Sequence, residues 1–299
     1  MMIRHLALLA QSVTSARLDL DMVRRWSALV SLVLLLAVLA ACSGGTQPIA
    51  LVASAPASLA VGNQRVLLGI VDPDTQAFLA DPEIEASATF TSPSGDEKEV
   101  GLEFVWAIPD QRGLYRVDVD LPEAGNWTVS VAAEGFSPTE PVPLTVVEDT
   151  PMPQVGEKGP AVATRTADEF ELSEITTDPE PDPELYRLSL DEALTDDRPT
   201  VVVFATPAFC TSQTCGPVLD NVKELAPAYP DVDFIHVEVY ENLDAQSFEE
   251  LIPVEAVNAW GLPSEPWVFV TDADGVITAR YEGTLDPVEL EESLGALTS

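Results

Sequence analysis

Short β-like runs of mostly apolar residues recur between residues 48 and 147. Proline, glycine and aspartate separate these runs, which occupy residues 65–71, 86–90, 113–121 and 127–131. In the last two, apolar and polar residues alternate, and such a period of two places successive side chains on opposite faces of a strand, so that one face can be buried. Several such strands joined by tight turns predict an all-β domain, an antiparallel β-sandwich, over residues 48–147. Trp127 is expected in its core.

After residue 183 the pattern changes, and predicted strands alternate with predicted helices. The strands are expected at residues 186–188, 201–204, 233–239, 267–270 and 276–281. Asp272 to Gly275 form a hairpin turn between the last two. One helix is expected after Ser189, where Glu192 completes a capping box, and two more at 218–225 and 287–297. This order predicts an α/β domain over residues 183–299.

The segment between these regions, residues 148–182, is rich in proline and in acidic side chains. Such a composition offers little apolar surface to bury. It predicts an extended linker between the two domains.

A further apolar stretch fills residues 28–41, directly after Arg24 and Arg25. It is shorter than the ~20 residues that a membrane span needs, and it predicts a signal peptide over residues 1–41. Asp19 and Asp21 are unusual before such a basic region. Their presence favours a translation start at Met22.

Residues 39–42 read Leu-Ala-Ala-Cys, which resembles the lipobox of bacterial lipoproteins. The resemblance implies cleavage before Cys42, a lipid such as palmitate on its sulfur, and a short tether at 42–47. It places the protein on the extracytoplasmic face of the cell membrane. The alternative is an ordinary signal anchor in which Cys42 is incidental.

Charge narrows the classes of partner. The chain has 50 Asp and Glu against 14 Lys and Arg, a net charge of -36. Such a chain is repelled by nucleic acid, so no nucleic-acid partner is expected. One of the two histidines precedes the predicted cleavage site, which argues against a histidine-based metal site, and no cofactor is expected. His236, inside an apolar run, is expected in the core.

Cys210 and Cys215 follow the predicted strand 201–204 and precede a predicted helix. A thiol at a helix N-terminus is acidified by the free N–H groups and the helix dipole. Residues five apart on a regular helix lie ~8.6 Å apart, beyond the roughly 7 Å limit of a disulfide. A disulfide between the two therefore requires a loop, and the helix is expected to begin after Cys215, with Pro217 in its first turn.

The strand and helix order of residues 183–299, with cysteines after its central strand, resembles the thioredoxin fold. The resemblance implies a cis-proline at the start of a later strand, for which Pro266 is the first choice and Pro263 the rival. Residues 215–218 read Cys-Gly-Pro-Val and resemble the membrane-anchored thioredoxins of cytochrome maturation, with Val218 in place of the second cysteine. Residues 113–131 resemble immunoglobulin-like accessory domains of bacterial surface proteins, including the YtkA-like family.

Three functions follow from these resemblances. The first is a thiol–disulfide oxidoreductase that uses Cys210 and Cys215 on the thiols or disulfides of exported proteins. Either cysteine could attack and the other resolve, and Cys210 is favoured as the more exposed. The second is a redox-inert binding protein with a structural disulfide. The third is a thiol peroxidase, because residues 210–216 resemble peroxiredoxins of the bacterioferritin-comigratory type. The chain departs from that family at Val203, Pro207 and Pro266.

Two acidic residues affect which of these three functions is favoured. Glu265 is expected close to the thiols, where a negative charge would raise a thiol pKa and slow attack. Glu238 is expected to be solvated at the end of its strand.

Overall fold

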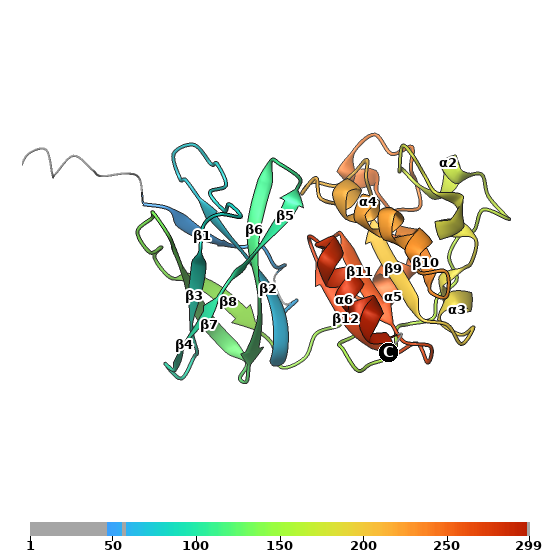
Figure 1. The fold of residues 1–299 in the computed structure, drawn as a ribbon. Coiled ribbons are helices and arrows are strands. Elements are labelled where there is room, and N and C mark those ends of the chain that lie inside the picture. Colours follow the sequence, from blue (N-terminus) through green and yellow to red (C-terminus); the bar gives the residue numbers. More distant parts are fainter. Residues whose placement is uncertain (1–46, 56–57, 298–299) are drawn as a thin grey trace, which may run out of the picture. The chain divides into compact units, whose positions relative to one another are not determined.

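The structure is a computed structural model that describes residues 47–55 and 58–297 (Figure 1). The predicted signal peptide, the lipid on Cys42 and all but the last residue of the tether lie outside the described residues. Within the part of the chain that is described, no helix is both long enough and apolar enough to cross a membrane.

The N-terminal lobe consists of two antiparallel four-stranded sheets. The first has the order β1-β2-β6-β5, and its strands are β1 (Ile49–Val52), β2 (Gly62–Val71), β6 (Arg112–Leu121) and β5 (Glu103–Ile108). The second has the order β4-β3-β7-β8, and its strands are β4 (Glu97–Gly101), β3 (Ala86–Thr91), β7 (Gly125–Ala133) and β8 (Val142–Val146). The four β-like runs of the sequence correspond to β2, β3, β6 and β7.

The inner faces of the two sheets share one core. Val66 and Leu68 of β2 lie in the same buried cluster as Phe90 of β3 and Val129 of β7. Trp127 is buried there as expected, and its indole N–H donates to the carbonyl of Glu123 at 2.9 Å. The alternation predicted for residues 113–121 and 127–131 is present in the burial of β6 and β7, whereas the immunoglobulin-like assignment stays a prediction.

The C-terminal lobe is built on a mixed four-stranded sheet of order β10-β9-β11-β12. Its strands are β9 (Thr200–Ala205), β10 (Asp233–Glu238), β11 (Trp267–Thr271) and β12 (Ile277–Glu282). β10 runs parallel to β9, whereas β11 runs antiparallel to both β9 and β12. This arrangement is consistent with the thioredoxin-like fold that the sequence predicts.

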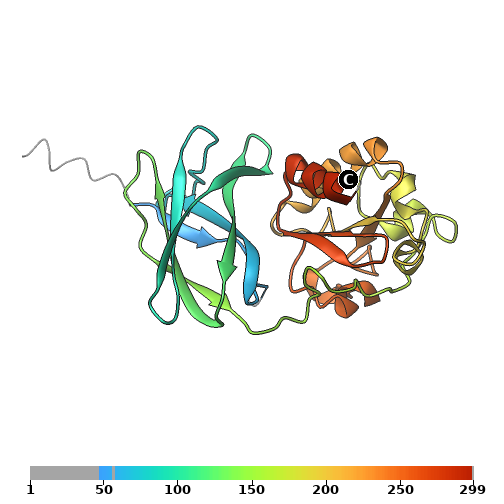
Figure 2. The same ribbon diagram turned by 60° about the horizontal axis from the view of Figure 1, so that its bottom comes forward.

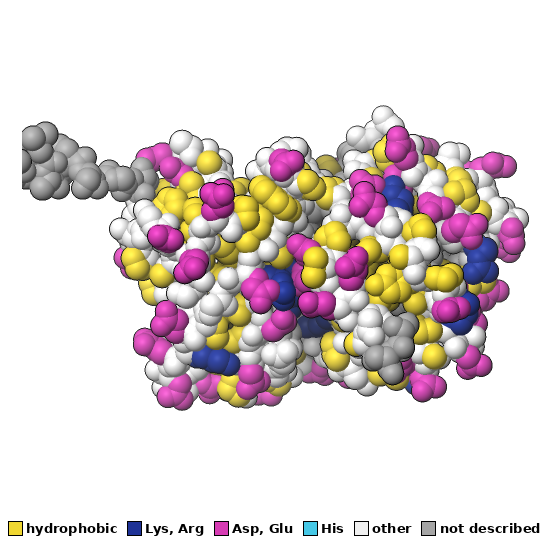
Figure 3. Space-filling model, viewed as in Figure 1, with side chains coloured by type: hydrophobic (Ala, Val, Ile, Leu, Met, Phe, Trp, Pro, Cys, Tyr) yellow, Lys and Arg dark blue, Asp and Glu magenta, His cyan; other side chains and the backbone are white. Residues whose placement is uncertain are grey.

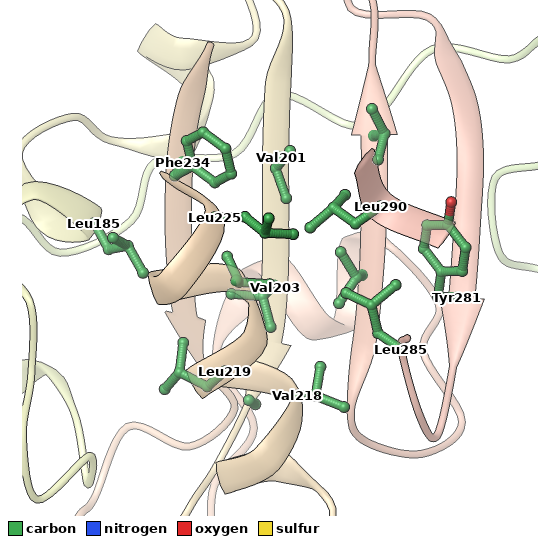
Figure 4. Close-up of a cluster of buried hydrophobic side chains, with 14 of the residues drawn as sticks. Leu185, Val201, Val203, Val218, Leu219, Leu225, Phe234, Tyr281, Leu285 and Leu290 are labelled. Carbon is green, nitrogen blue, oxygen red and sulfur yellow. The ribbon is translucent and has the colours of Figure 1, made fainter. Parts of the chain in front are cut away.

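Helices cover both faces of this sheet (Figure 2). The helices are α2 (Leu172–Ile175), α3 (Leu190–Ala193), α4 (Cys215–Leu225), α5 (Glu255–Ala259) and α6 (Pro287–Leu297), with 3-10 turns η1 (Pro183–Tyr186), η2 (Ala226–Ala228) and η3 (Phe248–Glu250). Val201 and Val203 of β9 pack against α4 and α6 (Figure 4). Val202 and Phe204, which point the other way, pack against α3 and Trp260. Every residue of β9 is buried, as its continuous apolar run predicts.

Two local predictions are settled by hydrogen bonds. The capping box of Ser189 and Glu192 is present at the start of α3. The predicted strand at 186–188 is wrong, because this part of the chain follows the 3-10 turn η1. Pro183 occupies the first position of that turn, and the side chain of Asp182 accepts from the amide of Glu184 at 3.1 Å. These contacts stabilise a turn where the short apolar-polar alternation predicts a strand.

The predicted linker at 148–182 is not free of the core. Met152 and Ile175 are buried in the two hydrophobic clusters of the C-terminal lobe. The amide of Gly156 donates to the carbonyl of Ile277, and the amide of Ile277 donates to the carbonyl of Glu157, both at 2.8 Å. The composition of the segment is polar on average, but single apolar residues anchor it to the lobe.

Replacing Met152 with alanine tests this anchoring. Met152 is 1% exposed, so Met152→Ala is expected to lower the free energy of unfolding by about 2–5 kcal/mol. Val155, in the same segment, is 58% exposed, so Val155→Ala is expected to change it by less than about 0.5 kcal/mol. Urea unfolding followed by tryptophan fluorescence measures both. A change below about 0.5 kcal/mol in Met152→Ala as well would contradict the anchoring of this segment.

Candidate functional site

The two cysteines lie where β9 gives way to α4. β9 ends at Ala205, a loop follows, and α4 begins at Cys215, one residue earlier than the sequence predicts. Gly216 and Pro217 occupy the first turn, where the missing N–H of proline is tolerated. Cys210 lies in the loop and is half-buried, whereas Cys215 is fully buried.

Hydrogen bonds converge on the sulfur of Cys210. The backbone amide of Cys215 donates to Cys210 Sγ at 3.3 Å, and Ser212 Oγ lies 3.2 Å from the same sulfur. Ser212 Oγ in turn lies 2.8 Å from Thr214 Oγ1. Both cysteines are free thiols, so the expected disulfide loop is not formed and the structure describes the reduced pair. Disulfide formation stays a prediction.

The two thiols differ in acidity. A hydrogen bond from the Cys215 thiol, with smaller contributions from Ser212 and from backbone amides, lowers the pKa of Cys210 to about 5 against the opposing effect of burial. The same hydrogen bond, together with burial, raises the pKa of Cys215 well above its ordinary value. At neutral pH, Cys210 is therefore the nucleophilic thiolate and Cys215 a protonated thiol.

The segment before β11 completes the site. The peptide bond between Glu265 and Pro266 is cis, as the sequence predicts for Pro266, and its role in substrate pairing stays a prediction. Trp267, the next residue, pairs with Phe204 of β9, which brings this segment to the end of β9 where the cysteine loop begins.

Glu265 is half-buried and close enough to the thiols for its charge to act on them. Burial raises its pKa to about 7, and the negative charges of Cys210 and Glu238 act in the same direction. The sequence predicts that this carboxylate opposes thiol acidity. In the structure its charge adds to the rise in the pKa of Cys215, but the hydrogen bonds to Cys210 outweigh it at the attacking sulfur.

The sequence did not predict the contacts of Thr177 and Glu238, which support the cysteine loop. Thr177 Oγ1 accepts from the amide of Ala208 at 3.1 Å and donates to Glu238 Oε2 at 2.7 Å. The sequence predicts that Glu238 is solvated, but in the structure it is 5% exposed. Its Oε2 also accepts from the amide of Thr177 at 2.8 Å. No local signal marks these residues, since Thr177 lies in the predicted linker and meets the loop only in the folded chain.

A third missed residue comes from the N-terminal lobe. Arg112, the first residue of β6, donates from Nη1 to the carbonyl of Ser212 at 2.8 Å. Its guanidinium lies 5.2 Å from the centre of the Phe78 ring, in a cation–π contact. The cysteine loop is thus held by side chains from two earlier segments of the chain, Arg112 of β6 and Thr177.

His236 is a core residue, in line with the sequence prediction. Its Nε2 lies 3.1 Å from the carbonyl oxygen of Ala205 and therefore donates, so Nδ1 accepts from Tyr186 Oη at 2.6 Å. Burial lowers the pKa of His236 and keeps the ring neutral. Within residues 47–55 and 58–297, no group of three His, Cys, Asp or Glu side chains could hold a metal ion.

The acidity of Cys210 predicts a distinctive pH profile for alkylation by iodoacetamide. The rate is expected to rise around pH 5 as the thiolate forms, and to rise slightly again near pH 7. The second rise follows because ionised Glu265 makes the thiolate more basic and so more nucleophilic. Glu265→Gln is expected to remove only the second rise, since Glu265 is already protonated at pH 5.

Mass spectrometry of the labelled protein measures the profile. Cys210→Ser serves as the control and is expected to label poorly, because Cys215 is buried. A single midpoint near the ordinary thiol pKa of about 8.5 would contradict the hydrogen-bonded thiolate.

Comparison with known proteins adds little to this geometry. No protein-family model matches the chain, and no curated protein matches it either. One similar solved structure is a Chlorobium tepidum protein assigned as the thiol:disulfide interchange protein DsbE, with 13% sequence identity and a TM-score of 0.35. The similarity covers 49% of this chain and 99% of that chain. A score of that size carries no argument, so the site rests on this chain's own strand order and contacts.

Proposed function

We propose that this protein is a thiol–disulfide oxidoreductase in which Cys210 attacks and Cys215 resolves. The observation that carries the proposal is the Cys210 sulfur held at the start of α4, where it accepts from the amide of Cys215 at 3.3 Å and lies 3.2 Å from Ser212 Oγ. In line with this geometry, the pKa values of Cys210 and Cys215 move in opposite directions. A half-buried, acidic thiol next to a fully buried, weakly acidic one suits a two-step exchange, because only the first is accessible and ionised enough to start it.

In the first step, the Cys210 thiolate attacks one sulfur of a partner disulfide. A mixed disulfide forms, and the other partner sulfur leaves as a thiolate. In the second step, Cys215 loses its proton to that thiolate and attacks Cys210 Sγ. The Cys210–Cys215 disulfide forms, and the second partner sulfur leaves and takes a proton from water. The partner is reduced, the protein is oxidised, and the reverse sequence oxidises a partner dithiol.

The first step prepares the second. The main cause of the raised pKa of Cys215 is its hydrogen bond to Cys210. When Cys210 becomes part of the mixed disulfide it loses its negative charge, so this cause disappears and Cys215 becomes more acidic. The resolving thiol is therefore activated only after the attacking thiol has reacted.

A purely structural disulfide has less support. The loop keeps its shape in the reduced state, because Thr177 holds the amide of Ala208 and Arg112 holds the carbonyl of Ser212. A disulfide closing so short a loop would add only ~2 kcal/mol in the chain-entropy model. A peroxidase also has less support, since Val203, Pro207 and Pro266 occupy positions that the peroxidase family fills differently.

The cellular location and the partners of this activity are inferred from the sequence. A lipid on Cys42 would anchor the protein at the extracytoplasmic membrane face, where disulfides persist and exported proteins are the available partners. Acidic side chains are spread over the face shown in Figure 3, with few Lys and Arg between them, which disfavours nucleic acid as a partner. The N-terminal lobe would serve as an immunoglobulin-like accessory domain.

The reduction potential of the Cys210–Cys215 pair tests the function directly. Residues 46–299, equilibrated in glutathione redox buffers, are expected to give a value between about -120 and -270 mV, the range of known exchange proteins. A value below about -300 mV would indicate a structural disulfide instead.

Serine substitutions test the roles of the two cysteines. Cys210→Ser is expected to abolish reduction of a disulfide substrate, because the attacking thiolate is gone. Cys215→Ser keeps a hydrogen-bond donor to Cys210 but cannot resolve, so a one-to-one mixed disulfide with the substrate is expected to accumulate. Turnover and non-reducing mass spectrometry measure these outcomes. Unchanged turnover by Cys210→Ser would overturn the assignment.

A further inference from the structure

A cleft of about 450 Å³ opens beside the cysteine loop. One side is formed by Ser212 and its neighbours in the loop and by residues 263–265, which lead into the cis peptide bond. The other side is formed by residues of the N-terminal lobe. The volume falls within the roughly 300–1,000 Å³ that is common for ligand sites.

The wall from the N-terminal lobe is apolar. It includes Leu51 of β1, Leu67 of β2, Leu114 of β6 and the ring of Phe78. Leu67 and Leu114 belong to a small apolar cluster that is separate from the core between the two sheets. A strand with one buried face would carry polar residues at these positions. Leu51 is 41% exposed, so the wall is still open to a partner.

Most of the polar side chains that line the cleft already form hydrogen bonds within the protein. Arg112 donates to the carbonyl of Ser212, as described above. Glu282 accepts from the amide of Ala55 at 2.6 Å and from Ser264 Oγ at 3.3 Å. Ser54 Oγ is buried and has no hydrogen-bond partner among the described residues. The cleft therefore offers apolar contact and one unused hydroxyl.

The cleft is continuous with the thiol site. Ser212 lines the cleft, and its Oγ lies 3.2 Å from Cys210 Sγ. Glu265 lines the cleft as well and precedes Pro266. A polypeptide whose cysteine reaches Cys210 Sγ therefore places its neighbouring residues at the mouth of the cleft.

We propose that this cleft binds an apolar side chain next to the reacting cysteine of a partner protein. The proposal rests on the proposed function and names its substrate class: a disulfide flanked by apolar residues in an extended segment. An aliphatic side chain would bury itself against Leu51, Phe78 and Leu114, away from water. An acidic side chain there would meet Glu265 and Glu282 and be repelled.

Two peptides that differ only beside the cysteine test this specificity. Each carries one cysteine as a mixed disulfide with glutathione, flanked by leucines in one peptide and by serines in the other. The full-length protein is expected to react with the leucine peptide about tenfold faster in kcat/KM, because burial of one leucine suffices for that factor. The ratio of the two rates is the readout.

Leu51→Ser and Ile49→Ser form a matched pair of variants. Both residues point to the same side of β1 and are similarly exposed, 41% and 48%, but only Leu51 lines the cleft. Leu51→Ser is expected to bring the ratio close to one, and Ile49→Ser is expected to keep it. Equal rates for the two peptides with the unchanged protein, or a full ratio in Leu51→Ser, would overturn the inference.

A binding measurement separates this inference from the proposed function. Fluorescently labelled peptides with serine in place of cysteine cannot exchange, so their anisotropy reports the cleft alone. The leucine peptide is expected to bind about tenfold more tightly than the serine peptide, and Leu51→Ser is expected to remove the difference. If neither glutathione mixed disulfide reacts, the proposed function fails and this measurement still decides the inference. Equal binding of both peptides overturns it.

Discussion

The chemistry of this chain depends on one hydrogen-bonded sulfur. The amide of Cys215 donates to Cys210 Sγ, and Ser212 Oγ lies 3.2 Å from the same sulfur, because the loop turns back onto the first residue of α4. Each donor stabilises negative charge at that atom, and a helix N-terminus adds its dipole. Differences in acidity, in exposure and in the order of the two chemical steps all follow from this contact.

The rest of the C-terminal lobe holds that contact in place. β9 is buried along its whole length between two helical layers, so the start of the loop is fixed. Beyond β9, the loop has no regular structure before α4 and depends on distant side chains. Thr177 fixes its beginning and Arg112 its end, although these residues lie in segments far apart in the sequence. A reactive thiol is thus carried by a loop whose shape is set from outside it.

Local patterns predict most of the regular structure. Short β-like runs identified β2, β3, β6 and β7. The strands β1, β4, β5 and β8 were not predicted, and β4 is mostly polar and exposed. The apolar run of β9, the hairpin before β12 and the cysteine turn predicted the order of the C-terminal lobe and its candidate cysteines. The contacts of Thr177, Glu238 and Arg112 could not be predicted, because each joins residues that no local pattern relates. Average composition likewise concealed the anchoring roles of Met152 and Ile175.

The segment at 148–182 also covers part of the edge of the sheet in the C-terminal lobe. β12 is the last strand of its sheet, and an open strand edge is a template for pairing with another chain. Here Gly156 and Glu157 occupy hydrogen-bonding groups of Ile277, and the amide of Gly159 donates to the carbonyl of Gly275 at 3.0 Å. Proline, which has no N–H to offer, follows at Pro160. The segment therefore occupies the edge groups of Ile277, the first residue of β12, and of Gly275 before it, so that another chain cannot pair with them.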